Sequence, residues 1–180
     1  YISNRKEYIE WKALAKENGK LLLISEYALD CKEYNKEYED VTWGTSSICK
    51  WLNGKFMQEA FTIDEQKRIV EIEVENPNNN RYGTKGGNAE RNKLFLLSID
   101  EAETYFASDE ARECVPTAYA IANGTWEGGN GNCWWWLRSP GYIQNYAAGV
   151  RDSGGVSARG FGVDSDYYAV RPALWIDLES

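Results

Sequence analysis

The sequence contains no histidine in its 180 residues. Histidine is the commonest general base in enzymes and the commonest side-chain ligand of transition metals. Its absence excludes Ser-His-Asp and Cys-His catalytic arrangements. No other group of side chains stands out as a metal site or a cofactor site, so we expect neither a bound metal nor a cofactor.

Other motifs that carry chemistry are also missing. There is no Walker loop or dinucleotide fingerprint, and residues 83–87 (GTKGG) lack both the required spacing and a strand-loop-helix setting. Carboxylates are plentiful, but no spacing singles out a glycosidase-type pair, so an enzyme that uses carboxylates is the least favoured function. The cysteines form no C-x-x-C pair, which argues against zinc and favours free buried thiols, with one or two disulfides as the alternative. They are Cys31, Cys49, Cys114 and Cys133.

No apolar run is long enough to span a bilayer, and Leu21 to Ile24 is short enough for a buried strand. The formal net charge of −8 opposes binding to nucleic-acid phosphates or to an anionic membrane. We therefore expect neither nucleic-acid binding nor direct membrane insertion. The chain begins at Tyr1 rather than Met and shows no signal peptide, so we expect a piece of a longer protein.

Aromatic residues are abundant, with 8 Trp and 12 Tyr. A chain of this length forms one domain, expected over residues 1–180, and buries roughly 70 % of its unfolded surface. Because aromatic rings bury large areas, they are expected to supply much of the stability.

Local patterns predict a strand pair, helices, a strand, more helices and a strand-rich end. Asn18-Gly19 between apolar runs predicts a hairpin with Trp11 and Leu22 facing inward. Thr45 or Ser46 is a suitable cap for a helix that extends to Ala60, and capping boxes open helices at Thr62 and Ser98. Further helical turns are expected over 108–114 and 116–122, and strands over 69–74 and 93–97. A solvated connection is expected over 30–40, and a long loop rich in Asn and Gly over 76–88.

The C-terminal part contains two framing blocks, residues 134–140 (WWWLRSP) and 169–176 (AVRPALWI), which bracket a tract from Tyr142 to Tyr168. Recurrent Gly-Val pairs in this tract predict short strands joined by turns. Val150, Val156 and Val163 are expected to anchor these strands, while their neighbours face solvent.

Two arginines in the framing blocks, Arg138 and Arg171, are interpreted as structural. Because side chains alternate along a strand, Trp135 is expected opposite Trp134 and Trp136, where it would line a ligand surface.

The composition of the tract is unusual for a solvated loop. All lysines, glutamates and tryptophans of the chain lie outside it, as does the single methionine. Tyr, Ser, Gly and Arg remain, and these are favoured at antibody-like binding surfaces. An ordinary surface hairpin is the alternative interpretation, since Gly, Ser and Asp are common turn residues.

The motifs WWWLRSPG, AAGV, the Gly-Val repeats and AVRPALWI resemble the variable proteins of diversity-generating retroelements. LLLISEYALDCK, DVTWGT, KWLNGKF, FLLSIDEAETYF and PTAYAIANG extend the likeness over most of the chain. The resemblance implies an α+β, C-type-lectin-like fold with a small antiparallel sheet, flanking helices, and paired first and last strands. It also implies a tract diversified by mutation at template adenines, which does not produce Lys, Glu, Trp, Met or Gln. Gln144 departs from that pattern and is expected to be fixed or to come from another codon.

The resemblance implies a non-enzymatic, receptor-like or adhesin-like protein that binds a protein or glycan on another cell. We expect it at a cell surface, outside the cell or on a phage particle. An undiversified lectin-like or structural domain of a bacterial surface protein is the alternative. The Glu-Pro-Asn and Trp-Asn-Asp motifs of calcium-dependent lectins are absent, which disfavours calcium-mediated sugar capture. The expected ligand-binding residues are Tyr142, Ile143, Gln144, Tyr146, Gly149, Arg151, Ser153, Ser157, Arg159, Phe161, Ser165, Tyr167 and Tyr168.

Overall fold

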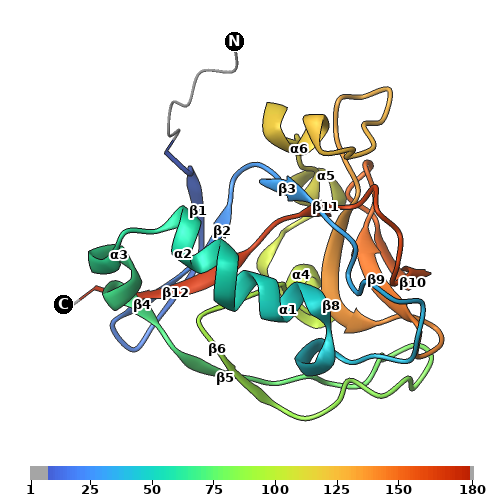
Figure 1. Cartoon of the computed structure of the whole chain (residues 1–180), viewed down its shortest axis with the longest axis horizontal. Coiled ribbons are helices and arrows are strands. Elements are labelled where there is room, and N and C mark those ends of the chain that lie inside the picture. Colours follow the sequence, from blue (N-terminus) through green and yellow to red (C-terminus); the bar gives the residue numbers. More distant parts are fainter. Residues whose placement is uncertain (1–7, 179–180) are drawn as a thin grey trace.

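A computed structural model describes residues 8–178 of the protein, which is a mixed α and β structure. Two sheets lie side by side, and the chain segment that carries the last two strands runs from one to the other (Figure 1). The first sheet consists of β1 (Trp11–Glu17), β2 (Lys20–Ser25), β12 (Ala173–Asp177), β4 (Ile69–Val70) and β7 (Leu94–Phe95). The second consists of β10 (Val156–Gly162), β9 (Tyr146–Val150), β8 (Trp135–Pro140), β11 (Ala169–Val170) and β3 (Asp30–Cys31). A separate pair joins β5 (Ile72–Val74) to β6 (Glu90–Asn92).

The predicted hairpin at Asn18-Gly19 is confirmed, since both turn residues have positive φ angles, of 49° and 74°. Leu22 is buried, whereas Trp11 is half-buried and stacks on Phe61. The last strand, β12, pairs with β2, which lies between β12 and β1. The expectation that the first and last strands pair directly is therefore wrong. The inner strand of the hairpin carries the apolar run and takes the buried position between two partners.

The helix predicted to end at Ala60 is formed by three continuous pieces: α1 (Ser47–Trp51), the π-helical turn η2 (Leu52–Phe56) and α2 (Met57–Ala60). Ser46 caps it by accepting a hydrogen bond from the Cys49 amide. Both predicted capping boxes are present, at α3 (Ile63–Arg68) and at α4 (Ile99–Tyr105). The remaining helices are the 3₁₀ turn η1 (Trp43–Thr45), α5 (Asp109–Arg112) and α6 (Ala118–Ala122).

Three predictions based on local patterns need correction. Residues 69–74 form two strands in different sheets, and of residues 93–97 only Leu94–Phe95 are in a strand. The segment 30–40, expected to be solvated, contains the buried Tyr34, whose hydroxyl donates to the Arg138 carbonyl oxygen at 2.8 Å. Contacts with distant strands outweigh the polar composition of this segment.

The two framing arginines are structural, as predicted. Arg138 is 3 % exposed and binds Glu101, and it donates to backbone carbonyls of Glu75 and Leu96. Arg171 is 1 % exposed, donates to the Ser25 carbonyl oxygen and packs against the Trp135 ring. All four cysteines are free. Within residues 8–178, no helix is long and apolar enough to cross a membrane.

Candidate functional site

The tract folds as an antiparallel pair of strands at one end of the second sheet (Figure 1). Val156 lies opposite Val150, and Gly162 lies opposite Tyr146, with an irregularity between Ser157 and Phe161. Gly160 occupies this irregularity with a φ of 69°, and a Cβ there would lie 2.1 Å from the Ala147 carbonyl oxygen. Only glycine fits this position without a shift of the backbone.

The inward side of the tract includes residues that were expected to anchor it. Val150 and Val163 are buried, and Val156 is half-buried. Three expected ligand contacts are buried as well: Gly149, Ser157 and Tyr168. Their expected solvent exposure is therefore wrong, because Gly149 lies against the Trp135 backbone and the Tyr168 ring stacks on Trp136 at 4.2 Å.

The other expected contacts reach the surface to different degrees. Five are exposed: Ile143, Arg151, Ser153, Arg159 and Tyr167. Another five are partly exposed: Tyr142, Gln144, Tyr146, Phe161 and Ser165. We call these ten residues the tract face.

Aromatic rings form a continuous row along part of the tract face. Tyr142 lies 4.8 Å from Tyr146 and 6.2 Å from Tyr82, measured between ring centroids. Tyr146 in turn lies 6.4 Å from Tyr38, and the Arg159 guanidinium lies 4.8 Å from the Tyr142 ring. Sequence reasoning missed Tyr38 and Tyr82, which belong to distant loops. The tyrosine content of residues 30–40 was a signal for Tyr38, whereas nothing in the Asn-rich and Gly-rich segment 76–88 singled out Tyr82.

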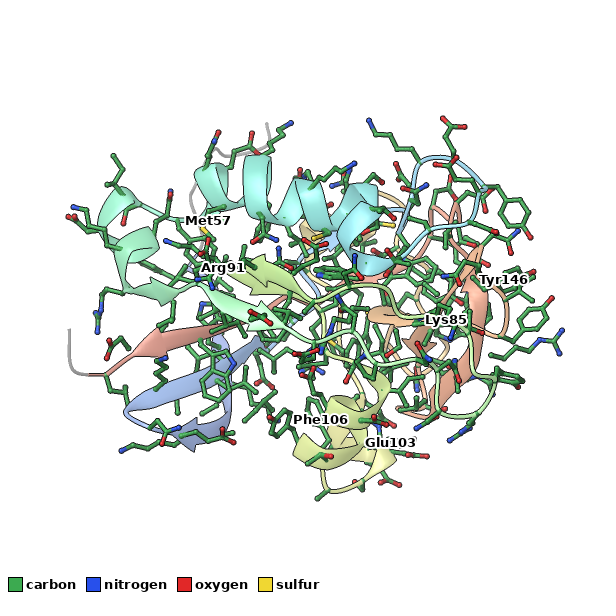
Figure 2. The ribbon with its side chains drawn as sticks, turned by 90° about the horizontal axis from the view of Figure 1, so that it is seen from below. Met57, Lys85, Arg91, Glu103, Phe106 and Tyr146 are labelled. Carbon is green, nitrogen blue, oxygen red and sulfur yellow. The ribbon has the colours of Figure 1, made fainter. Side chains whose placement is uncertain are left out.

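Two loops hold the tract in place. The buried Asn79 side chain donates to the carbonyl oxygens of Pro140 and Ala158, each at 2.8 Å. The Gln144 amide donates to the carbonyl oxygens of Val41 and Lys85, each at 3.0 Å. Figure 2 shows Lys85 and Tyr146 at the same end of the molecule. Gln144 therefore has a structural role that the exposed tract residues lack.

The tryptophan run alternates as predicted, since Trp134 and Trp136 both contact Tyr168. The expectation that Trp135 lines a ligand surface is wrong, because its ring is fully buried and its Nε1 donates to the Arg112 carbonyl oxygen. Trp134 is the member of the run nearest to solvent. Its ring contacts Phe161, and its Nε1 donates to Asp152 at 2.9 Å.

A hollow of about 420 Å³ opens on the tract face. Aromatic rings and one carboxylate line most of it. The lining residues are Tyr38, Tyr146, Phe161, Gly162, Asp164, Ser165 and Tyr167. Two larger hollows, of about 680 Å³ and 820 Å³, adjoin the start of β1 and helix α2, outside the tract.

Burial raises the pKa of the Tyr168 phenol beneath the tract face, and it raises the pKa of the Tyr34 phenol in the same way. Both groups stay protonated at neutral pH and act as parts of the core. Among residues 8–178, no three cysteine, aspartate or glutamate side chains gather into a group that would hold a metal ion. The tract face thus combines several aromatic rings with two exposed arginines, Arg151 and Arg159.

The fold and this surface together define a mixed α and β protein that presents a tyrosine-rich tract. Residues 18–178 match a family described as a domain of unknown function (DUF6273), and the chain belongs to this family. No curated protein and no solved structure shows a significant match to the chain.

Proposed function

We propose that the protein is a non-enzymatic binding protein that displays a diversified surface, the tract face, on a C-type-lectin-like scaffold. The observation that carries the proposal is the division of the tract by burial. Val150, Val163 and Tyr168 are buried, whereas Arg151, Arg159 and Tyr167 between them are exposed. One short segment thus contains both fixed anchors and freely substitutable positions.

The energetics of substitution support this division. Exposed positions that make no special contact tolerate replacement within about 0.5 kcal/mol. Truncation of a buried aliphatic side chain costs roughly 2–5 kcal/mol for the larger residues. Diversification restricted to the tract face would therefore change recognition while leaving the scaffold folded.

The scaffold part of the proposal rests on the sequence resemblance and on two features that agree with it. The last strand, β12, lies in one sheet with the N-terminal hairpin, and the tract lies on a second small sheet. Gln144, which mutation of template adenines does not produce, bonds two loop carbonyls and has a reason to be fixed.

The proposed partner is a protein or glycan on another cell, met by this surface at a cell surface, outside the cell or on a phage particle. Tyrosine supplies contact area with few rotatable bonds, and Ser, Gly and Arg supply adaptable polar contacts. Tyr142, Tyr146 and Tyr167 are such residues on the tract face, together with Arg151 and Arg159.

Deep sequencing of this coding region from one population of source cells tests the proposal. We expect substitutions at Tyr142, Tyr146, Arg159 and Tyr167, located at template adenines, with Gln144 unchanged. The framing blocks 134–140 and 169–176 are the internal control and should be invariant. A tract as uniform as these blocks would contradict diversification and favour a fixed surface domain.

A further inference from the structure

We propose that the hollow on the tract face is a binding site for an alkylammonium group, and that this group belongs to a lysine or methylated lysine side chain of a protein partner. The inference rests on the proposed function and deepens it, because it gives the ligand a chemical class. The lining of the hollow combines four aromatic residues with a single carboxylate, Asp164.

The aromatic residues that line the hollow come from different parts of the chain. Tyr146 lies on β9, Phe161 on β10, Tyr167 follows β10, and Tyr38 comes from the 30–40 segment. That segment is held to the tract by the backbone N–H of Asn35, which donates to the Val163 carbonyl oxygen at 2.8 Å. Aromatic faces attract cations through the ring quadrupole, and several rings around one space are the recurrent way to bind a quaternary ammonium.

Gly162 keeps the space between the Tyr38 ring and the carboxylate open. A Cβ at this position would lie 3.1 Å from Asp164 Oδ1 and 3.3 Å from Tyr38 Cε2. The carboxylate and the ring edge therefore both face the same glycine. Any side chain at position 162 would take up the volume in which a ligand would meet both groups.

The charge around the hollow favours a cation. Its described lining contains Asp164 and no lysine or arginine. The segment that carries Tyr38 is negatively charged. It contains three exposed carboxylates, Glu37, Glu39 and Asp40, and one exposed lysine, Lys36. The nearby Arg159 guanidinium lies over Tyr142, which is outside the lining. A cationic ligand would therefore contact aromatic rings in a region of negative charge.

The same charges decide between two sources of an alkylammonium group. A choline headgroup carries a phosphate, which the acidic segment 37–40 would repel. A lysine on a basic protein surface brings no such anion, and its neighbours would be attracted by the net charge of −8. We therefore assign the site to a protein side chain.

The test titrates the whole chain with choline and with 3,3-dimethylbutan-1-ol, which has the same shape but carries no charge. Chemical shifts of the tyrosine and phenylalanine ring protons report binding. We expect the rings to respond to choline and the neutral alcohol to bind at least about fivefold more weakly. Equal binding of the two probes, or no binding of choline, would overturn the inference without any use of a variant.

Matched variants locate the site. Asp164→Asn and Tyr167→Leu should each weaken choline binding about fivefold. Asp166→Asn removes the same charge from an exposed residue outside the lining and should change binding less than about twofold. Equal effects of the two aspartate variants would show that net charge alone attracts the probe, which would overturn the site.

A trimethyl-lysine peptide and phosphatidylcholine vesicles separate the two sources. We expect the peptide to bind, to compete with choline and to bind more weakly to Asp164→Asn, whereas the vesicles should not bind. Vesicle binding without peptide binding would contradict the protein source. If none of the cations binds, the site is contradicted but the proposed diversification is not, because sequencing tests diversification independently. Choline binding with an invariant tract would instead support the site and contradict diversification.

Discussion

The side-chain amide of Asn79 donates a hydrogen bond of 2.8 Å to the carbonyl oxygen of Ala158, which lies 79 positions later in the chain. The same amide also bonds the Pro140 carbonyl oxygen, and its own carbonyl accepts from the amides of Arg81 and Tyr82. One buried residue thus joins a long loop to β8 and to β10, the two strands that flank β9 in the second sheet.

Asn79→Ala should therefore lower the free energy of unfolding by about 2–3 kcal/mol, because it leaves several buried carbonyl and amide groups without a partner. Urea denaturation followed by tryptophan fluorescence measures this. Asn80→Ala is the matched control: its amide bonds only the exposed Asp100, and the expected loss is below about 0.5 kcal/mol. Equal losses for the two variants would show that Asn79 does not fasten the tract.

Arg138→Lys should destabilise the protein by about 3–5 kcal/mol. Lysine does not reproduce the fork of donors that Arg138 directs at Glu101 and at the Glu75 and Leu96 carbonyls, so buried polar groups lose their partners. Arg81→Lys, at an exposed ion pair with Glu103, should cost less than about 1 kcal/mol. Thermal unfolding measures the stability of both variants. A loss of stability in Arg138→Lys no larger than that in Arg81→Lys would contradict the structural role of Arg138.

Tyr34→Phe and Tyr168→Phe remove one buried hydroxyl each, but with different costs. The Tyr34 hydroxyl bonds the Arg138 carbonyl oxygen, so its loss should cost about 1–2 kcal/mol. The Tyr168 hydroxyl has no hydrogen-bond partner in the described part of the chain, so its loss should cost less than about 0.5 kcal/mol. Urea midpoints at pH 7 compare them, and the reverse order would contradict these contacts.

The same two phenols predict a loss of stability at alkaline pH. Burial raises the pKa of both above the ordinary value of 10.0. Below that pH both the folded and unfolded states hold the proton, so stability does not depend on these groups. Above it the unfolded chain releases the protons and the folded chain does not, so stability falls as pH rises. Urea midpoints are measured between about pH 9 and pH 11, a range that brackets the ordinary tyrosine pKa. They should decline less steeply with pH in Tyr34→Phe or Tyr168→Phe than in the original protein. An unchanged slope would show that the phenols are accessible.

Thiol reactivity tests the burial of the cysteines. Cys31 is half-buried, and burial raises its pKa. The other cysteines are buried, and burial raises the pKa of Cys49 to about 12. Iodoacetamide should label Cys31 slowly in the folded protein, faster as pH rises, and the others only after unfolding. Peptide mass spectrometry identifies the labelled residue, and rapid labelling of Cys133 would contradict the fold.

Local signals predicted the elements well where contacts are local. Ser46, Thr62 and Ser98 cap helices as expected, because a cap depends on residues three positions away. Long-range pairing was not visible in the same way. The partner of β12 and the burial of Tyr34 depend on residues far along the chain, and no local pattern reports them.

The candidate site shows the same limit. The tract could be located from its composition and from its framing blocks. Its inner and outer residues could not be separated, since Gly149 and Tyr168 are buried by contacts with Trp135 and Trp136 of a neighbouring strand. Tyr38 lies at the site because hydrogen bonds hold the 30–40 segment against the tract. Those hydrogen bonds join residues far apart in the chain, so no local sequence pattern predicts them.

The most direct test of the central claim compares the melting temperatures of two combined variants of the tract. One changes the exposed Ile143, Arg151, Arg159 and Tyr167 to serine, and the other changes the buried Val150 and Val163 to serine. If the tract is a substitutable surface on fixed anchors, the first variant melts within a few degrees of the original protein, while the second melts far lower or does not fold. Extensive unfolding of the first variant would show that the tract is part of the core and would contradict the proposed display.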